Sequence, residues 1–374
     1  MNELQPGSEE ELAELVRDAA AGGGRLALRG GGTRGAEAAE GAVRLSTRGL
    51  RGITLYEPGA LTLVARAGTP LAEVEAALEG EGQMLAFEPW DARALLGSNG
   101  TPTVGGMAAA NASGPRRLQA GACRDGMIGL RFVDGTGAVV KNGGRVMKNV
   151  TGLDLVKLLA GSRGRLGALT EVAFKVVPAP EARATLIWEG LGLGTAVELM
   201  TAATGTPYEV SGAAHLPAGA DPARTLLRLE GFAGSVAHRA RALAATLARF
   251  GPPATEEGPG PWAGIRDAAS LAGREGAVWR ISVRPTDAPR VAAALPEADL
   301  AIDWAGGLVW ALAPETIDLR GRLAGAPGHA TLVRGSPAAR AAWGVAPPEP
   351  PAVAALSAGL RAKFDPMGVF GGNG

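Results

Sequence analysis

The sequence predicts a two-domain α+β protein, and three observations support this prediction. At 374 residues the chain is too long for one ordinary hydrophobic core. Strand-like and helix-like apolar periodicities occur in both halves. Pro178 and Pro180 stop a strongly apolar strand near the middle of the chain. We therefore expect a first domain at residues 1–180, an α+β domain at 181–350, and a C-terminal helix and tail at 351–374 that return to the first domain.

The first domain begins with a helix and a strand. Ser8 and Glu11 form a capping box, and apolar residues then recur at helical spacing until glycines 22–24. Residues 25–29 are typical of a short strand that runs directly into Gly30, Gly31 and Gly32. A strand that feeds a glycine loop is the first point of chemical interest.

The same patterns predict the remaining elements of this domain. Thr69 and Pro70 are suited to the N-cap and first position of a helix that carries Leu71. An Asp134-Gly135 turn tolerates the positive φ angles of a tight hairpin. Residues 95–121 show little periodicity. The other expected segments are strands at 43–46, 53–56, 61–66, 127–133, 138–141 and 169–177, and a helix at 150–159.

The second domain is predicted to mix strands and helices. We expect strands at 186–189, 225–230 and 278–283 and helices at 195–203 and 235–250. A hairpin of strands 300–304 and 308–311 surrounds Gly306-Gly307, and a proline-rich connector at 337–351 leads to a last helix at 353–364 and the tail 365–374.

Composition excludes several kinds of site and partner. Basic and acidic residues balance at 37 each, so no global field attracts nucleic acid. The single cysteine, Cys123, rules out an internal disulfide and an iron–sulfur cluster held by this chain. The acidic start and the lack of about 20 consecutive apolar residues argue against a secretory signal and direct membrane insertion. We expect a cytoplasmic protein, or one peripheral at the inner membrane through partners.

The glycine loop supports two interpretations. Gly30, Gly32 and Gly35 fit the G-x-G-x-x-G dinucleotide pattern, but only residues 36–40 precede the next turn. That is too short for the helix of a Rossmann unit. What remains is a turn whose N–H groups can form an anion nest, or a plain tight turn.

A second segment, residues 101–117, also suits close approach of a ligand to the main chain. Its side chains are small or neutral hydrogen-bonding groups until Arg116 and Arg117, which can offset phosphate charge at the rim. The alternative is a flexible surface loop.

Taken together, these motifs resemble a known family. The chain carries Leu28-Arg-Gly-Gly-Gly-Thr33, Thr103-Val-Gly-Gly-Met-Ala-Ala-Ala-Asn-Ala-Ser-Gly-Pro-Arg-Arg117, Val146-Met-Lys-Asn149 and Gly161-Ser-Arg-Gly-Arg-Leu-Gly167 in order. They are similar to the FAD-binding (PCMH-type) domain of the vanillyl-alcohol oxidase and p-cresol methylhydroxylase family, over nearly all of residues 5–180. Within that family, the smaller FAD-binding subunits of bacterial glycolate oxidases are the most similar.

The resemblance implies two α/β subdomains that clamp FAD, followed by an α+β cap domain with an antiparallel sheet. Thr33 stands where members with covalent flavin often carry His, so we expect non-covalent FAD. The residues that the resemblance assigns to FAD are Arg29, Gly30, Gly31, Gly32, Thr33, Thr103, Val104, Gly105, Gly106, Asn111, Ser113, Gly114, Arg116, Gly121, Asp125, Gly164, Gly167 and Leu169. The tail Val369-Phe-Gly-Gly-Asn-Gly374 departs from the family pattern, which puts the usual terminal turn in doubt.

The sequence provides little for substrate oxidation itself. Removing hydride from a 2-hydroxy acid needs a base and a cation for the carboxylate. The three histidines are far apart in sequence and form no metal-ligand pair. We expect His215 to be structural and His238 to be solvated, which leaves His329 and Arg334 as weak catalytic candidates. Arg280 and Arg284 are further possible carboxylate anchors, or ordinary surface arginines.

The resemblance therefore implies a subunit that binds FAD and supports or relays electrons for two partners. These are a larger catalytic FAD subunit and an iron–sulfur subunit of a glycolate oxidase complex. The alternative is an autonomous FAD-dependent oxidase or dehydrogenase of glycolate, D-lactate or a related 2-hydroxy acid. A structural homologue that has lost FAD is disfavoured, because the glycine loops are intact.

Overall fold

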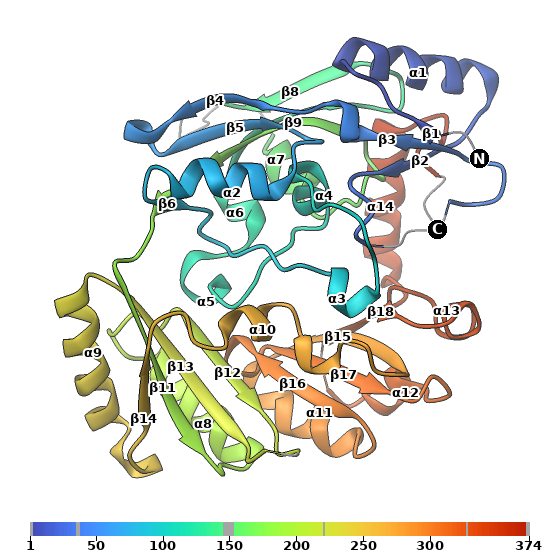
Figure 1. Cartoon of the computed structure of the whole chain (residues 1–374). Helices are drawn as coiled ribbons and strands as arrows, with labels where there is room; N and C mark the ends of the chain where they lie inside the picture. Colours follow the sequence, from blue (N-terminus) through green and yellow to red (C-terminus); the bar gives the residue numbers. More distant parts are fainter. Residues whose placement is uncertain (1–2, 35–37, 145–152, 220, 327, 372–374) are drawn as a thin grey trace.

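The computed structural model describes residues 3–34, 38–144, 153–219, 221–326 and 328–371. The N-terminal part (β1 to β10) lies above the C-terminal part (β11 to β18) in Figure 1. Gly35 and the motif Val146–Asn149 fall outside the described residues. Strand β10 ends at Pro178 and β11 begins at Ala182, so we propose to keep the division at residue 180.

A small parallel sheet forms one half of the N-terminal part. Its strand order is β1 (Glu3–Leu4), β3 (Val43–Ser46), β2 (Leu26–Arg29). Helix α1 (Glu9–Gly22) precedes β2. Its start confirms Ser8 as the N-cap, because the Ser8 hydroxyl accepts from the Glu11 N–H, and Gly23 ends the helix at φ 67°. The other half of the predicted capping box is replaced, because the Glu11 carboxylate accepts from the Gly7 N–H. The described residues between β2 and β3 form no helix, which agrees with the rejection of a Rossmann unit.

A five-stranded antiparallel sheet forms the other half. Its strands, in spatial order, are β4 (Ile53–Glu57), β5 (Thr62–Arg66), β9 (Ala168–Lys175), β7 (Met127–Val133) and β8 (Val139–Gly143). Strands β6 (Gln83–Met84) and β10 (Val177–Pro178) pair separately. Helix α2 (Leu71–Glu79) packs Leu71, Val74 and Leu78 into the core of this half.

Two sequence predictions for this part were wrong in detail. Pro70, not Thr69, is the N-cap of α2, because the Thr69 hydroxyl instead bonds the main chain of Gly52. The hairpin turn has its positive φ at Gly137 rather than Gly135. Gly135 is needed for a different reason: a Cβ there would lie 2.2 Å from the Asp365 carboxylate.

The stretch at residues 95–121 is more regular than its sequence predicted. It holds or borders the short helices α3 (Arg93–Leu96), α4 (Val104–Ala109) and α5 (Arg117–Ala120), and α6 (Cys123–Gly126) follows. Helix α4 was not predicted, because its residues are mostly small and a helical periodicity is detectable only with larger apolar side chains. The helix predicted at 150–159 is observed over α7 (Leu155–Leu159), and residues 150–152 are outside the described part.

The C-terminal part is one eight-stranded antiparallel sheet. In spatial order its strands are β14 (Ala254–Glu257), β11 (Ala182–Glu189), β13 (Arg224–Gly231), β12 (Gly212–Leu216), β16 (Asp299–Asp303), β17 (Leu308–Ala313), β15 (Ala277–Val283) and β18 (Gly328–Arg334). The hairpin around Gly306-Gly307 is confirmed. Strands β12 and β14 were missed, because alanine-rich or fully exposed strands lack an alternating pattern.

The two faces of this sheet have different neighbours. Helices α8 (Leu193–Thr204), α9 (Ala233–Thr246) and α11 (Ala288–Ala294) cover the face that points away from the N-terminal part (Figure 1). The opposite face packs against α10 (Trp262–Arg266), Leu95 and Trp90. The fold class predicted from the sequence, two small α/β units followed by a cap with an antiparallel sheet, is confirmed.

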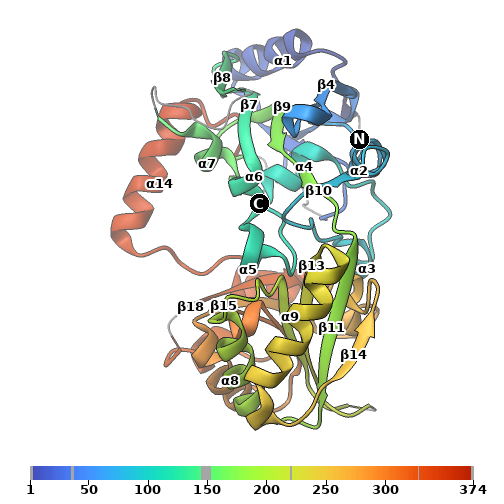
Figure 2. The same ribbon diagram turned by 90° about the vertical axis from the view of Figure 1, so that its left-hand side faces the viewer.

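The C-terminal segment connects the two parts along one side of the molecule (Figure 2). The last three helices of the chain are α12 (Leu319–Arg322), α13 (Pro337–Trp343) and α14 (Pro351–Phe364). Because α13 lies within residues 337–351, the predicted proline-rich connector is partly helical. The Gly135 N–H donates to the Phe364 carbonyl at 2.8 Å. Both carboxylate oxygens of Asp365 accept from the N–H groups of Val369 and Phe370, which are buried against α1 and β2. Residues 372–374, including Asn373 of the divergent tail, lie outside the described part.

A buried ion-pair network joins the two parts. Glu230 of β13 accepts from Arg116 at 2.9 Å and lies 3.1 Å and 3.2 Å from Arg183 and Arg228. Arg228 also makes a two-pronged contact to Glu88 of the N-terminal part, at 2.8 and 2.7 Å. Arg228 and Arg116 hold the pKa of the Glu230 carboxyl below its usual range despite burial.

Replacing Glu230 by Gln is expected to destabilise the chain strongly. The change leaves buried guanidinium groups without their shared carboxylate, which costs about 3–5 kcal/mol in comparable buried pairs. Glu73→Gln is the matched control, because it breaks only the exposed Arg51–Glu73 pair and should cost less than about 1 kcal/mol. Urea unfolding of both variants measures the difference, and equal costs would contradict the assigned role.

Candidate functional site

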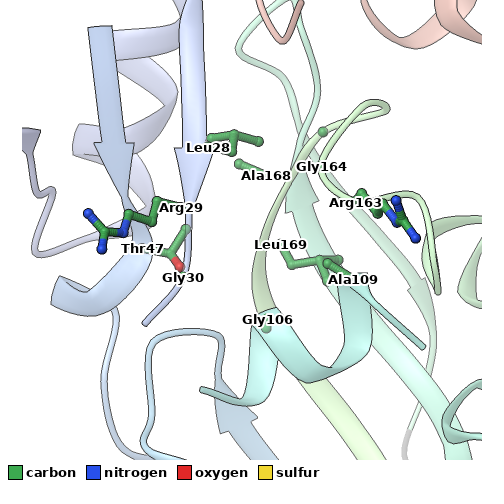
Figure 3. Close-up of a pocket in the computed structure, with 12 residues that line it drawn as sticks. Leu28, Arg29, Gly30, Thr47, Gly106, Ala109, Arg163, Gly164, Ala168 and Leu169 are labelled. Atoms are coloured by element: carbon green, nitrogen blue, oxygen red, sulfur yellow. The ribbon is translucent and has the colours of Figure 1, made fainter. Parts of the chain in front are cut away.

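A pocket opens between the two halves of the N-terminal part. Figure 3 shows the end of β2, the start of α4 and the turn before β9 around it. Its walls come from four separate segments of the chain. The lining residues are Leu28, Arg29, Gly30, Thr47, Gly105, Gly106, Ala109, Arg163, Gly164, Gly167, Ala168 and Leu169.

Seven of these residues were predicted from the sequence, and the tertiary fold explains the others. Thr47 directly follows β3, the parallel neighbour of β2, so both strands end at the same edge of the sheet. That rule could have found Thr47. Ala109 and Arg163 carry no signal in sequence, since an alanine at a helix end and a lone arginine are common.

The loop that follows β2 is packed against the second predicted segment. The Thr101 N–H donates to the Gly31 carbonyl at 3.0 Å. A Cβ on Gly31 would lie 1.5 Å from the Thr101 carbonyl oxygen, and one on Gly30 would lie 2.8 Å from the Thr103 hydroxyl. Side chains are therefore excluded here by the close approach of two main-chain segments.

The same loop has main-chain N–H groups without an acceptor among the described residues. In the described part of the chain, none of the main-chain N–H groups of residues 30–33 donates to an acceptor. Gly32 adopts φ 76°, the left-handed conformation that turns successive N–H groups toward one point. Such a concave set of free donors is a site for an anion.

Helix α4 forms the floor of the pocket. Thr103 caps it, with the hydroxyl accepting from the Gly106 N–H at 3.3 Å, while Val104 is fully buried in the core. A Cβ on Gly105 would lie 2.7 Å from the Ala67 side chain, so glycine lets the helix approach β5 closely. Of the predicted residues here, Gly105 and Gly106 reach the pocket, and Thr103 and Val104 position them.

Four further predicted residues fix a loop instead of lining the pocket. The Asn111 carboxamide oxygen accepts from the Arg124 N–H at 3.0 Å, and the Ser113 hydroxyl accepts from the Cys123 N–H at 2.9 Å. The Asp125 carboxylate accepts from the Ala122 N–H at 2.8 Å, close to Gly121 at φ 77°. Their predicted contact with a cofactor stays a prediction.

Arg116 and Gly114 belong to the interface between the two parts. Arg116 donates to the Glu230 carboxylate and the Ala86 carbonyl, so we no longer assign it to the rim of a phosphate site. The Gly114 carbonyl accepts from the Trp304 indole N–H at 3.0 Å. Gly114 cannot carry a side chain, because a Cβ would lie 2.5 Å from the Glu88 carbonyl oxygen.

The histidines and Arg334 are not gathered at one centre. His215 is buried in β12 and bonds Thr225 at 2.9 Å, and burial lowers its pKa to about 4. His238 is exposed on α9, as predicted. His329 is exposed on β18, and Arg334 donates to the Leu95 carbonyl at 2.9 Å and to the Arg274 carbonyl. Among the described residues, no three acidic, histidine or cysteine side chains are placed to hold a metal ion.

The interface carries a buried carboxyl that the sequence did not indicate. Asp303, at the end of β16, is 2% exposed, and its carboxylate accepts from the Trp304 N–H at 2.7 Å. Burial raises the pKa of Asp303 to about 7, against the opposing effects of Arg228 and Arg280. Ordinary aspartates are not expected to titrate near neutral pH, and only the fold reveals this one.

Comparisons with known proteins agree with this geometry. Residues 3–143 match the FAD binding domain family. The chain is 37% identical over 329 residues to the glycolate oxidase subunit GlcE of Escherichia coli (strain K12), covering 87% of this chain and 85% of that protein. It is 31% identical to the glycolate oxidase subunit GlcD of Bacillus subtilis (strain 168), covering 49% of this chain and 38% of that protein.

The fold is shared with a solved structure of more distant sequence. An alkyldihydroxyacetonephosphate synthase superposes with a TM-score of 0.71 at 17% identity, covering 99% of this chain and 76% of that one. No helix in the described residues is long and apolar enough to cross a bilayer.

The residues of the pocket fit FAD. The free N–H groups of residues 30–33 suit a diphosphate, and the glycines at 105, 106, 164 and 167 let a ligand approach the main chain at these points of the walls. The Arg34 Nε, next to this loop, is buried without an acceptor among the described residues.

Gly31→Ala should destabilise the chain, because no rotamer can move a Cβ away from the Thr101 carbonyl. Overpacking typically costs about 1–3 kcal/mol, and we expect a value near the upper end of that range. Gly22→Ala is the control: nothing lies within 4 Å of a Cβ there, and alanine favours the helix. Chemical unfolding compares them. An unchanged stability for Gly31→Ala would show that the loop is not held as described.

Asp303→Asn should change how stability depends on pH. Because the folded-state pKa is raised from 3.8 to about 7, the native state binds the proton more tightly than the unfolded state. The contribution of Asp303 is therefore fully present below about pH 4 and is lost as pH rises toward 7. In unfolding curves from pH 4 to 8, the free energy of unfolding of Asp303→Asn should rise relative to that of the native chain as pH rises. A constant difference would contradict the raised pKa.

Proposed function

This chain belongs to the FAD-binding family of glycolate oxidase subunits, and from that premise we propose that it is the smaller FAD-binding subunit of a glycolate oxidase complex. The supporting observation is the coincidence of two facts. Identity to the GlcE protein extends over both parts of the chain, and the glycine segments come together around one pocket.

FAD would lie with its diphosphate on the loop at residues 30–33. The N–H groups there could donate to the negatively charged phosphate oxygens, because no described protein acceptor competes for them. Gly105, Gly106, Gly164 and Gly167 allow the ligand to rest against the main chain. When bound, FAD supplies the acceptor for hydride or electrons. The protein contributes binding, orientation and exclusion of side chains from the walls.

The chain is proposed to act with partners instead of alone. Its histidines are dispersed, so the described residues provide no base cluster beside the pocket. A larger catalytic FAD subunit and an iron–sulfur subunit would complete the complex, with the flavin of this chain relaying electrons or stabilising the assembly. A cytoplasmic location, or a peripheral one at the inner membrane through these partners, is part of the proposal.

The purified chain tests this function directly. A yellow protein whose absorbance at the flavin bands is not bleached by glycolate or D-lactate supports the subunit. Bleaching by either acid supports the autonomous enzyme instead. A colourless protein that takes up no added FAD contradicts both, and co-purification of an iron–sulfur protein identifies the complex.

Ala109→Leu should weaken FAD binding by about tenfold or more, because the larger side chain occupies space that the dinucleotide needs. Ala110→Leu is the matched control, since Ala110 is half-buried like Ala109 but does not line the pocket. Flavin fluorescence titration of the FAD-free proteins gives both dissociation constants. Equal affinities would place FAD elsewhere.

A further inference from the structure

Helix α14 lies at the outer edge of the molecule (Figure 2). None of its 14 residues is buried, and only Phe364, its last residue, packs against the core of the N-terminal part. A helix of this length is marginally stable on its own in water, because most helices in proteins are stabilised by packing of one face. Gly359 near its middle lowers its stability further. Helix α14 therefore lacks the packing that normally stabilises such a helix.

One face of α14 carries a stripe of large apolar side chains. Val353, Leu356 and Leu360 follow one another at spacings of three and four residues, so they share one face of the helix. Their exposed fractions are 47%, 70% and 37%. Full burial of one such side chain contributes about 1.5–3 kcal/mol, so leaving three of them in water is unfavourable. The stripe indicates a surface that another chain covers.

Small residues border this stripe. Ala352, Ala355 and Gly359 recur at the same spacings on the adjoining side of the helix. A Cβ on Gly359 would meet no atom within 4 Å, so this side is open to a neighbour. Small residues let two helix backbones approach while the large side chains beside them interdigitate. A second helix therefore fits this surface.

The charges of this segment have opposite signs at its two ends. Glu349 precedes α14, whereas Arg361 and Lys363 lie in its last turn, and the helix contains no acidic residue. All three side chains are exposed, and within the described residues none of them forms an ion pair. A parallel copy of this segment would place like charges together. An antiparallel copy would place opposite charges together, so the charge pattern is self-complementary.

We propose that α14 is the contact between two copies of this chain, paired antiparallel about a two-fold axis at Leu356. Each residue then faces the residue of the other copy that is about equally far from Leu356, because a two-fold interface uses the same surface twice. Val353 of one copy lies beside Leu360 of the other, and Glu349 lies near Lys363. The contact does not rest on the proposed function.

The expected dimer is weak. A helix of 14 residues is about 21 Å long, so two such helices bury less than the roughly 1,200 Å² of a standard stable interface. In the two-fold pair, Ala352 of one copy meets Gly359 of the other, which lets the backbones approach closely. We therefore expect a dissociation constant of about 1–100 μM.

Sedimentation equilibrium of the full chain tests the contact. Between about 1 and 200 μM the native chain should change from monomer to dimer. Leu356→Glu should weaken the dimer by about tenfold or more, because two carboxylates would meet on the axis. Phe232→Glu is the matched control, since Phe232 is 71% exposed but lies directly before α9 and should leave the association unchanged. Far-ultraviolet circular dichroism verifies that each variant is folded.

Reversed charges test the antiparallel arrangement. Glu349→Lys should weaken the dimer by about three- to tenfold, because an exposed pair is replaced by a repulsion at both ends of the helix pair. Adding Lys363→Glu to this variant should restore most of the affinity, since each copy then presents the reversed pair to the other. No recovery in the double variant would contradict the antiparallel register.

Three results would overturn the proposal. The first is a native chain that stays monomeric at about 200 μM, and the second is a Leu356→Glu variant that associates like the native chain. The third is a monomeric chain that binds a different subunit and loses it in Leu356→Glu, which would assign α14 to that subunit. FAD binding is measured separately, so a dimer that takes up no FAD would refute the proposed function and leave the contact standing.

Discussion

The architecture of the pocket depends on one contact between two main-chain segments, where the Thr101 N–H meets the Gly31 carbonyl at 3.0 Å. Residues 70 positions apart are brought so close that no Cβ fits at Gly31. This contact fixes the loop after β2 relative to α4. Within the described residues the N–H groups of this loop have no acceptor, and Gly30 of the loop lines the pocket.

The second organising element is the sharing of charge between the two parts. Glu230 and Glu88 satisfy Arg116, Arg183 and Arg228, which closes the interface around a compensated network. Next to it, Arg280 and Arg117 contact the Trp304 ring and form no ion pair with a described residue. The arginines that are paired with Glu230 and Glu88 hold the two parts together. Arg117 and Arg280 leave the same interface electropositive.

These two elements suggest how a subunit whose described residues form no base cluster can still serve an oxidase. The N-terminal part supplies a pocket of main-chain donors for a dinucleotide, and the cap adds cations at its boundary. Neither requires a histidine, and the three in this sequence are dispersed: one is buried against Thr225 and two are exposed. Binding and charge are therefore provided locally, while the reactions that need proton transfer belong to partners in our proposal.

Sequence by itself determined the fold class, the strands β2 and β3 of the first sheet and the glycine loops, because periodicity, caps and glycine runs are local properties. It could not assign Arg116, whose carboxylate partner lies on a strand more than 100 residues away. Nor could it find Thr47, Arg163 or Asp303, since their surroundings come from distant segments. Which arginines are paired and which carboxyl is desolvated are properties of neighbours in space. Only the tertiary structure decided them.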